Sequence, residues 1–147
     1  METKLYIRDG KRFKYVPNML GMYWNGIILT KERMQDSIAI VIEQHYDHVV
    51  MASLTVGENE IEDWHDAKIW CENSFNGKGR LPSNTELINL RKYISNDIGS
   101  YVWGEEFSSM FAWYLYWYDG STYTGNKEYG RSIRAIAVTD VPILNLI

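Results

Sequence analysis

One ten-residue segment, FAWYLYWYDG from Phe111 to Gly120, limits the possible folds of this chain more than any other. Six of its residues are aromatic, and aromatic residues favour β-strands. Rings of this size must either pack in a core or gather on a binding surface. Because side chains alternate across a strand, the segment divides into two faces. One face carries Phe111, Trp113, Leu115 and Trp117, and the other carries Ala112, Tyr114, Tyr116 and Tyr118.

The chemistry of the two faces predicts which of them is buried. The first is apolar apart from its indole N–H groups, so we expect it to face the core. The second presents three phenols, and tyrosine supplies rigid, amphipathic area at binding surfaces. We expect these phenols to be displayed; cover by the C-terminal segment VPILNLI or by a second subunit is the alternative. The predicted contact surface comprises Tyr114, Tyr116, Tyr118, Asp119, Tyr123, Asn126 and Tyr129, with Trp103 and Glu105 at its edge.

The rest of the chain is rich in predicted strands. Asp9-Gly10 lies between two β-favouring runs, which predicts a hairpin whose two turn residues both have positive φ. The β-branched runs NGIILT, SIAIVIEQ and HVVMASLT predict three more strands. After Asn96, strands are expected at 101–103, 112–118 and 132–138, with connections at Gly120, Gly125 and Gly130.

Two helices are predicted between these groups of strands. Ile61, Trp64, Ala67 and Cys71 follow helical spacing, and Asn59 is the expected N-cap. The second helix has a clearer start, because Ser83-Asn84-Thr85-Glu86 fits a capping box. We expect that helix to span 83–95.

The order of strands, two helices and strands predicts an α+β fold with an N-terminal β-hairpin. A length of 147 residues fits a single domain. Within it we expect a β-rich part at 1–56, a core at 57–138 and a last strand or strap at 139–147.

A series of short motifs in the second half carries a resemblance. Arg80-Leu81-Pro82-Ser83 precedes Glu86-Leu87 and follows a helix with Ala67, Trp70 and Cys71. The later motifs, in order, are Tyr101-Val102-Trp103, Ala112-Trp113, Asp119-Gly120 and Ile133-Arg134-Ala135-Ile136. This series resembles the C-type-lectin-like domains related to formylglycine-generating enzyme. It is also similar to variable proteins of diversity-generating retroelements and to phage and bacterial surface domains.

The resemblance implies a C-type-lectin-like fold, with two helices packed around a twisted antiparallel sheet. In such domains the segment from the first aromatic strand to the closing strand faces the ligand. The enzymes of this group use a late cysteine pair, whereas this chain has only Cys71 and carries Ala135 in the closing strand. We therefore expect Cys71 to be a buried structural thiol and the chain not to be an enzyme, the oxidase being the disfavoured alternative.

Metal and cofactor sites are not expected. His45 and His48 are expected at a strand end and turn, and a spacing of three residues along a strand would place them on opposite faces. A zinc site needs about four converging ligands, and no such set stands out. Glu105, Glu106 and Asp119 offer oxygens for calcium, but without the paired loop motifs of calcium-dependent lectins.

The charge pattern and the ends of the chain limit its partners. The net charge is −4, which argues against nucleic acid. No run approaches the about eighteen apolar residues of a membrane span, so no membrane insertion is expected. The N-terminal METKLYIRDGKR has no apolar stretch, so we expect no secretory signal.

The tyrosine face predicts a binding module, and the resemblance, together with the expected lack of a secretory signal, implies a phage fibre or other virion-surface protein assembled in the host cytoplasm. Its expected partner is a host glycan or protein. The alternative is a virion assembly or decoration protein whose tyrosine face packs on other virion proteins or on copies of itself, a trimer being favoured.

Overall fold

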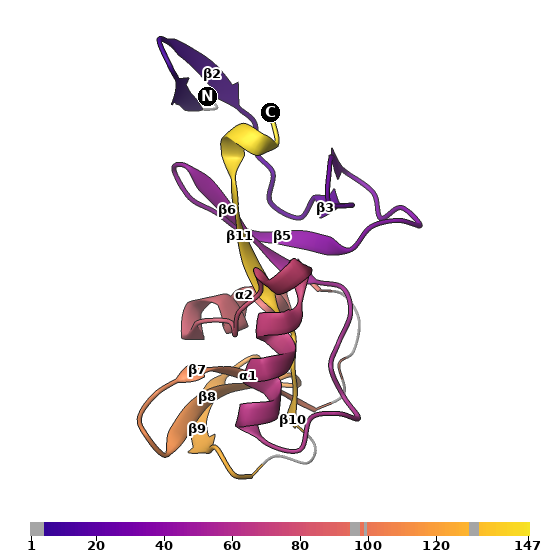
Figure 1. The fold of residues 1–147 in the computed structure, drawn as a ribbon, viewed down its shortest axis with the longest axis vertical. Helices are drawn as coiled ribbons and strands as arrows, with labels where there is room; N and C mark the ends of the chain where they lie inside the picture. The colour runs from indigo at the N-terminus through magenta and orange to yellow at the C-terminus, as the bar shows by residue number, and fades with distance from the viewer. Residues whose placement is uncertain (1–4, 95–97, 99, 130–132) are drawn as a thin grey trace.

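The computed structural model describes residues 5–94, 98, 100–129 and 133–147. Over these residues the chain forms two α-helices and three β-sheets, which confirms the α+β class (Figure 1). The helices are α1 (Trp64–Asn73) and α2 (Asn84–Tyr93), and the short 3-10 helices are η1 (Phe75–Gly77) and η2 (Ile143–Asn145). Because α2 contacts strands of both larger sheets, the helices do not simply surround one sheet.

The N-terminal hairpin forms as predicted, but its turn is of another type. Strands β1 (Leu5–Asp9) and β2 (Arg12–Val16) pair antiparallel and project from the rest of the chain (Figure 1). Asp9 pairs with Arg12, so the turn residues are Gly10 and Lys11, and only Gly10 has a positive φ, of 63°. One positive φ at the first turn position fits a type II′ turn, whereas two would define type I′.

A five-stranded antiparallel sheet forms the middle of the molecule. Its order is β11-β6-β5-β3-β4. The strands are β3 (Tyr23–Trp24), β4 (Leu29–Thr30), β5 (Ala39–Gln44), β6 (His48–Ser53) and β11 (Val138–Pro142). Strand β11 brings the C-terminal segment into the sheet built by the N-terminal part, which confirms the last strand expected there.

The β5–β6 connection corrects the expectation that the two histidines point to opposite faces. His45 and His48 lie at a strand end and turn, as predicted, and the His45 N–H donates to the His48 carbonyl at 2.8 Å. Their rings are stacked with centroids 4.6 Å apart. They therefore lie side by side, each bonded to its own carboxylate, Glu43 for His45 and Asp47 for His48.

A four-stranded sheet holds the aromatic segment. Its order is β10-β7-β8-β9, with β10 parallel to β7 and the other pairs antiparallel. The strands are β7 (Tyr101–Glu106), β8 (Phe111–Tyr116), β9 (Thr122–Asn126) and β10 (Ile133–Arg134). Strand β9 was not expected, and Gly125 lies inside it instead of in a connection.

Helix α1 begins later than predicted, and α2 begins where predicted. Asp63, and not Asn59, caps α1, because its side chain accepts the Asp66 N–H. At α2 both hydrogen bonds of the capping box between Ser83 and Glu86 are present. The expected end of that helix at 95, the turn at Gly130 and the strand start at 132 lie outside the described residues.

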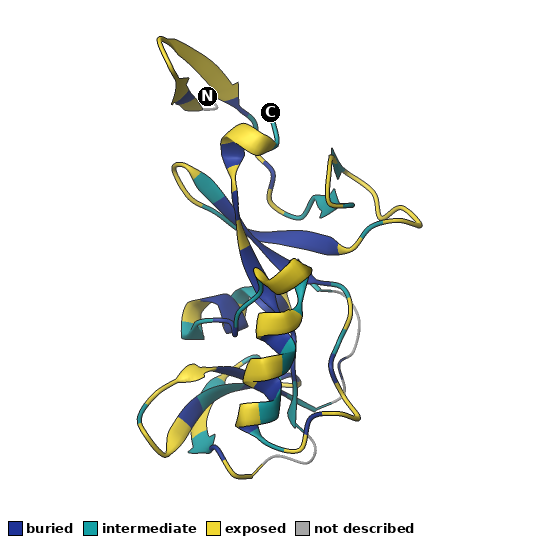
Figure 2. Cartoon of the chain, in the orientation of Figure 1, coloured by how far each residue is buried: buried dark blue, intermediate teal, exposed yellow. Residues whose placement is uncertain are grey.

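Both larger sheets contain buried residues (Figure 2), which pack against a helix, against the hairpin or against the other sheet. The α2 cluster joins Leu87 and Leu90 of α2 to Leu115, Trp117 and residues of both sheets. The α1 cluster comprises Ile61, Trp64, Ala67, Cys71, Leu81, Trp103, Ala112, Ala135 and Ala137. A third cluster attaches the hairpin, through Ile7 and Val16, to the other face of the five-stranded sheet.

Arg80 connects α2, the segment before it and β11. Its backbone N–H and carbonyl pair with Val138. Its guanidinium donates to both carboxylate oxygens of Glu86, at 2.6 and 2.8 Å, and to Asp140 at 2.9 Å. Glu86 is buried and also accepts the Ser83 N–H of the capping box. The same carboxylate therefore caps α2 and pairs with Arg80.

Candidate functional site: the tyrosine surface

Five tyrosines from β7, β8, β9 and the turn after β8 gather on one face of the four-stranded sheet. We call this set the tyrosine surface; its members are Tyr101, Tyr114, Tyr116, Tyr118 and Tyr123. The strand register produces it, because Tyr101 pairs with Tyr116 and Tyr114 pairs with Tyr123. Directly paired residues of neighbouring strands share a face.

The rings contact one another across the strands. Tyr101 stacks on Tyr116 with centroids 5.0 Å apart, and Tyr114 stacks on Tyr123 at 5.7 Å. Edge-to-face contacts at 5.5 Å between Tyr101 and Tyr114 and at 5.6 Å between Tyr116 and Tyr118 join these pairs. Aromatic pairs of this geometry hold each other's orientation. The tyrosine surface is therefore one connected array.

The division of β8 into two faces is confirmed in its middle. Leu115 is buried and Trp113 is packed against the α2 cluster, and Trp117 just after the strand is buried in the same cluster. Phe111 departs from the pattern, since it is 41% exposed at the first residue of the strand. Phe111 is exposed because it lies at the end of β8, beyond the elements that cover the middle of the strand.

The opposite face is displayed at one end only. Ala112 and Trp103 are fully buried in the α1 cluster, so the predicted edge residue Trp103 lies beneath the surface. Tyr114 and Tyr116 are half-buried, whereas Tyr118 is 60% and Tyr123 43% exposed. Exposure therefore increases away from α1, which packs on this face and was not expected to do so.

The C-terminal segment does not provide this cover. Strand β11 and η2 place Val141 and Ile143 in the third cluster, with Ile7 and Val16 of the hairpin. The alternative in which VPILNLI lies over the tyrosines is therefore wrong. Its residues bury a face of the five-stranded sheet instead.

A short turn fixes the exposed end of the tyrosine surface. One oxygen of Asp119 accepts the Ser121 N–H at 2.8 Å, and the other accepts the Tyr123 hydroxyl at 2.9 Å. Gly120 allows the turn with a φ of 72°. The hydrogen bond to this carboxylate raises the pKa of Tyr123. Its phenol therefore stays protonated above the pH at which an ordinary tyrosine ionises.

Three other predicted contact residues lie apart from this array. Glu105 is exposed near the end of β7, after a register irregularity that follows Trp103. Asn126 is three residues after Tyr123 on β9 and therefore lies on the opposite face of the sheet. Its side chain accepts the Glu128 N–H at 2.9 Å. Tyr129 is 73% exposed beyond β9. Of the predicted contact residues, the structure thus brings together only Tyr114, Tyr116, Tyr118, Asp119 and Tyr123.

Sequence reasoning missed Tyr101 as a member of the surface. The signal was available, because Tyr101-Val102-Trp103 alternates just as β8 does. Gly125 was also missed; a Cβ there would lie 2.9 Å from Cε1 of Tyr114. The absence of a side chain at Gly125 lets the Tyr114 ring lie over β9.

Lys127 contacts both the buried end of the four-stranded sheet and α1. Its ammonium lies 3.2 Å from Glu106, donates to the Ser109 carbonyl at 3.1 Å and lies 4.4 Å from the centre of the Trp64 ring. Although it is a lysine, it is 6% exposed. No pattern in the sequence distinguishes this lysine from a surface one.

Two of the carboxylates weighed for calcium binding are engaged in other contacts. Glu106 pairs with Lys127, and Asp119 holds Tyr123. Within the described residues, no three His, Cys, Asp or Glu side chains gather in a way that could hold a metal ion. Cys71 is buried in the α1 cluster, and burial raises the pKa of its thiol to about 12.

The position of Cys71 predicts an unreactive thiol. At neutral pH the folded protein is expected to release almost no thionitrobenzoate from Ellman's reagent, because the thiolate is the attacking species. Unfolding in guanidinium should then release one equivalent per chain, since Cys71 is the single cysteine. The absorbance time course measures both phases. Rapid reaction of the folded protein would instead show an accessible, ionised thiol and revive the enzyme hypothesis.

The arrangement suits recognition by contact. It offers aromatic ring faces and phenol hydroxyls that donate and accept hydrogen bonds, held in place by strand pairing. Neither α1, α2 nor another helix in the described ranges combines the length and apolar character needed to cross a bilayer. No protein-family model, curated protein or solved structure matches this chain.

Proposed function

We propose that this protein is a non-enzymatic binding module that recognises a host-surface glycan or protein through the tyrosine surface. One observation carries the proposal: five tyrosines in stacked and edge-to-face contact form a connected array whose outer members, Tyr118 and Tyr123, are exposed. Tyrosine is enriched at interaction hot spots and loses little side-chain entropy on binding. Asp119 adds a carboxylate beside the phenols.

The finer identity of the fold belongs to the same proposal. We infer a C-type-lectin-like domain from the motif series around Arg80-Leu81-Pro82-Ser83 and from the two helices beside the sheet that carries the aromatic strand. By its resemblance to phage and bacterial surface domains, we place the protein on a virion, in a fibre or a related adhesive part. The burial of Cys71 supports binding over oxidase chemistry.

A glycan array and a host-cell binding assay test the proposal with two matched variants. Replacing both Tyr118 and Tyr123 with alanine removes the exposed rings, and a loss of about 2 kcal/mol is expected, or about thirtyfold in affinity. Tyr46→Ala is the control, because Tyr46 is 77% exposed but lies at the β5–β6 turn. Its binding should equal that of the unmodified protein.

Three results would overturn the proposal. They are no binding to any glycan or host surface, full binding by the double variant, and equal losses in the double variant and in Tyr46→Ala. The melting temperature of each variant, followed by circular dichroism, confirms that the fold is intact. Because the double variant also loses the Tyr123–Asp119 hydrogen bond and two aromatic contacts, its free energy of unfolding is expected to fall by about 1–2 kcal/mol without loss of the fold.

The hairpin favours the second candidate function, virion assembly. Tyr6, Phe13 and Tyr15 are all about half exposed or more on this projecting two-stranded element. Such a hairpin is marginally stable in water by itself, so cover by another subunit would stabilise it. Light scattering decides: a stable trimer that Phe13→Ser dissociates supports assembly, and a monomer at all concentrations counts against it.

A further inference from the structure

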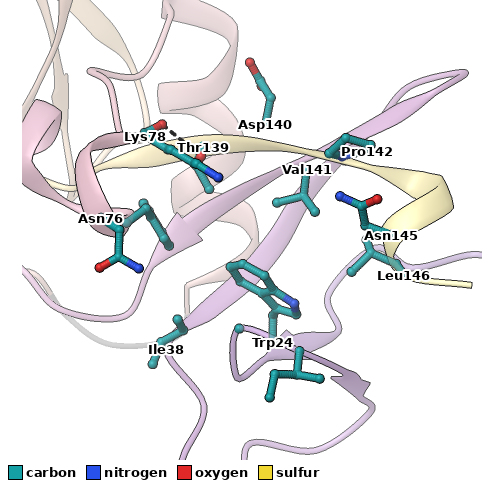
Figure 3. Close-up of a pocket in the computed structure, with 13 residues that line it drawn as sticks. Trp24, Ile38, Asn76, Lys78, Thr139, Asp140, Val141, Pro142, Asn145 and Leu146 are labelled. Atoms are coloured by element: carbon teal, nitrogen blue, oxygen red, sulfur yellow. Dashed lines mark hydrogen bonds between the residues drawn. The ribbon is translucent and has the colours of Figure 1, made fainter.

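A second candidate site lies against the five-stranded sheet, apart from the tyrosine surface. It is a pocket of about 370 Å³ between β11, the β3–β4 segment and the turn after α1 (Figure 3). A volume of this size accommodates small ligands. It shares no residue with the tyrosine surface. Its lining includes Trp24, Ile38, Asn76, Lys78, Val141 and Asn145.

Trp24 forms an aromatic wall of the pocket, and its indole N–H lacks a hydrogen-bond partner among the described residues. In Figure 3 the indole ring lies in the middle of the lining, with its nitrogen on the side where Asn145 and Leu146 are drawn. Nε1 is shielded from solvent and has no hydrogen-bond partner among the described residues. Buried N–H donors are almost always paired. The Trp24 indole therefore carries a donor that the described residues leave unused.

The wall opposite this ring is held in a strained conformation. Phe75 and Asn76 have φ values of 54° and 56°, in the left-handed region, and Gly77 follows with 84°. A bulky residue such as phenylalanine rarely adopts this conformation, and such outliers concentrate at ligand sites. Both residues line the pocket. The strained turn therefore places the Asn76 amide at the pocket instead of along a continued helix.

The polar groups of the lining favour a ligand that both donates and accepts hydrogen bonds. The amides of Asn76 and Asn145 do both. The Thr139 hydroxyl donates to the Lys78 carbonyl at 2.9 Å, drawn as a dashed line in Figure 3, so its oxygen can still accept. Asp140 pairs with Arg80 and points away from Trp24 in the same view. No cluster of like charge is present among these residues, which disfavours a phosphate.

We propose that this pocket binds a pyranose sugar. The apolar face of the ring would stack on Trp24, between Ile38 and Val141, and its hydroxyls would bond to Asn76 and Asn145. A sugar combines one apolar face with hydroxyls that donate and accept, which is the mixture that this lining presents. The site is independent of the tyrosine surface and extends the proposed function.

The indole N–H resonances of the ¹⁵N-labelled protein provide the test. Glucose, galactose, N-acetylglucosamine and glucuronate are each titrated to millimolar concentration, with Trp24→Phe identifying the Trp24 signal. We expect at least one sugar to shift this signal in a saturable manner. The Trp103 signal is an internal control, because its N–H is also buried and unpaired but lies outside the pocket. It should not move.

Two variants make the result specific. Trp24→Leu removes the stacking surface and should weaken binding at least tenfold, with the Asn145 backbone amide as the reporter. Asn76→Gly keeps the left-handed backbone but deletes the amide, so binding should weaken several-fold with the melting temperature retained. The variant lacking Tyr118 and Tyr123 rings should bind the sugar normally, which separates this site from the proposed function.

Three outcomes would overturn the assignment. The first is that no sugar shifts the Trp24 signal, or that the Trp24 and Trp103 signals shift together. The second is that Trp24→Leu binds the sugar as tightly as the unmodified protein. The third is that only inorganic phosphate or only benzyl alcohol binds, which would identify an anion site or a purely apolar pocket.

Discussion

Replacing Trp103 with alanine is expected to lower the free energy of unfolding by about 4 kcal/mol, within the range for truncating a buried tryptophan. Trp103 is fully buried in the α1 cluster and makes an edge-to-face contact with Tyr114 at a centroid distance of 6.2 Å. Its indole N–H has no partner among the described residues, and removal of that donor keeps the loss below the upper end of about 5 kcal/mol. Urea unfolding followed by tryptophan fluorescence measures the change.

The matched control for Trp103 is Tyr118, in the turn after β8 at the exposed end of the tyrosine surface. Tyr118→Ala removes an aromatic ring that is 60% exposed, so its cost should stay near about 0.5 kcal/mol. A domain of this size has about 5–15 kcal/mol of stability, so the two variants should be easily separated. Similar losses for both would contradict the cover of Trp103 by α1.

Replacing Arg80 with methionine is expected to cost about 3 kcal/mol, the low end for breaking a buried ion pair. Methionine keeps most of the apolar stem but leaves Glu86 buried without its cation. We choose the low end because the Arg80 side chain is 39% exposed and because Ser83 still donates to Glu86. Chemical denaturation at neutral pH measures the loss.

Lys68→Met is the control for the charge removed from Arg80. Lys68 and Glu72 form an exposed pair one turn apart on α1, with both side chains 51% exposed. Pairs of this kind contribute about 0.3–0.5 kcal/mol. The Arg80 variant should therefore lose several times more stability than the control. Equal losses would show that Arg80 acts as an ordinary surface charge and does not join α2 to β11.

The parts of the fold that the sequence predicts best are those fixed by local interactions. The capping box at Ser83 and Glu86 needs only residues within one helical turn, and it marks the start of α2 correctly. The alternation of β8 likewise follows from strand geometry alone, which is why Leu115 and Tyr114 fall on opposite faces as expected. The Asp9-Gly10 turn signal predicts the position of the hairpin correctly. It does not predict the exact turn residues, which are Gly10 and Lys11.

The parts that the sequence does not predict depend on contacts between distant segments. Whether Trp103 is displayed or buried depends on where α1 packs, and no local pattern contains that information. The same is true of Lys127, whose burial depends on Glu106 and Trp64. Of the candidate site, the phenols of β8 were therefore predictable, whereas the extent of their cover was not.

Photo-CIDNP tests most directly whether the tyrosine surface is open at its outer end. In this NMR experiment a flavin dye polarises only those tyrosine rings that it can reach. With micromolar protein, we predict strong signals from Tyr118 and Tyr123 and weak ones from Tyr114 and Tyr116. Tyr46, at the β5–β6 turn, serves as the exposed reference. Signals of Tyr118 and Tyr123 as strong as that of Tyr46 would support an open binding face. Their absence alongside a strong Tyr46 signal would contradict it and show that another subunit covers the phenols.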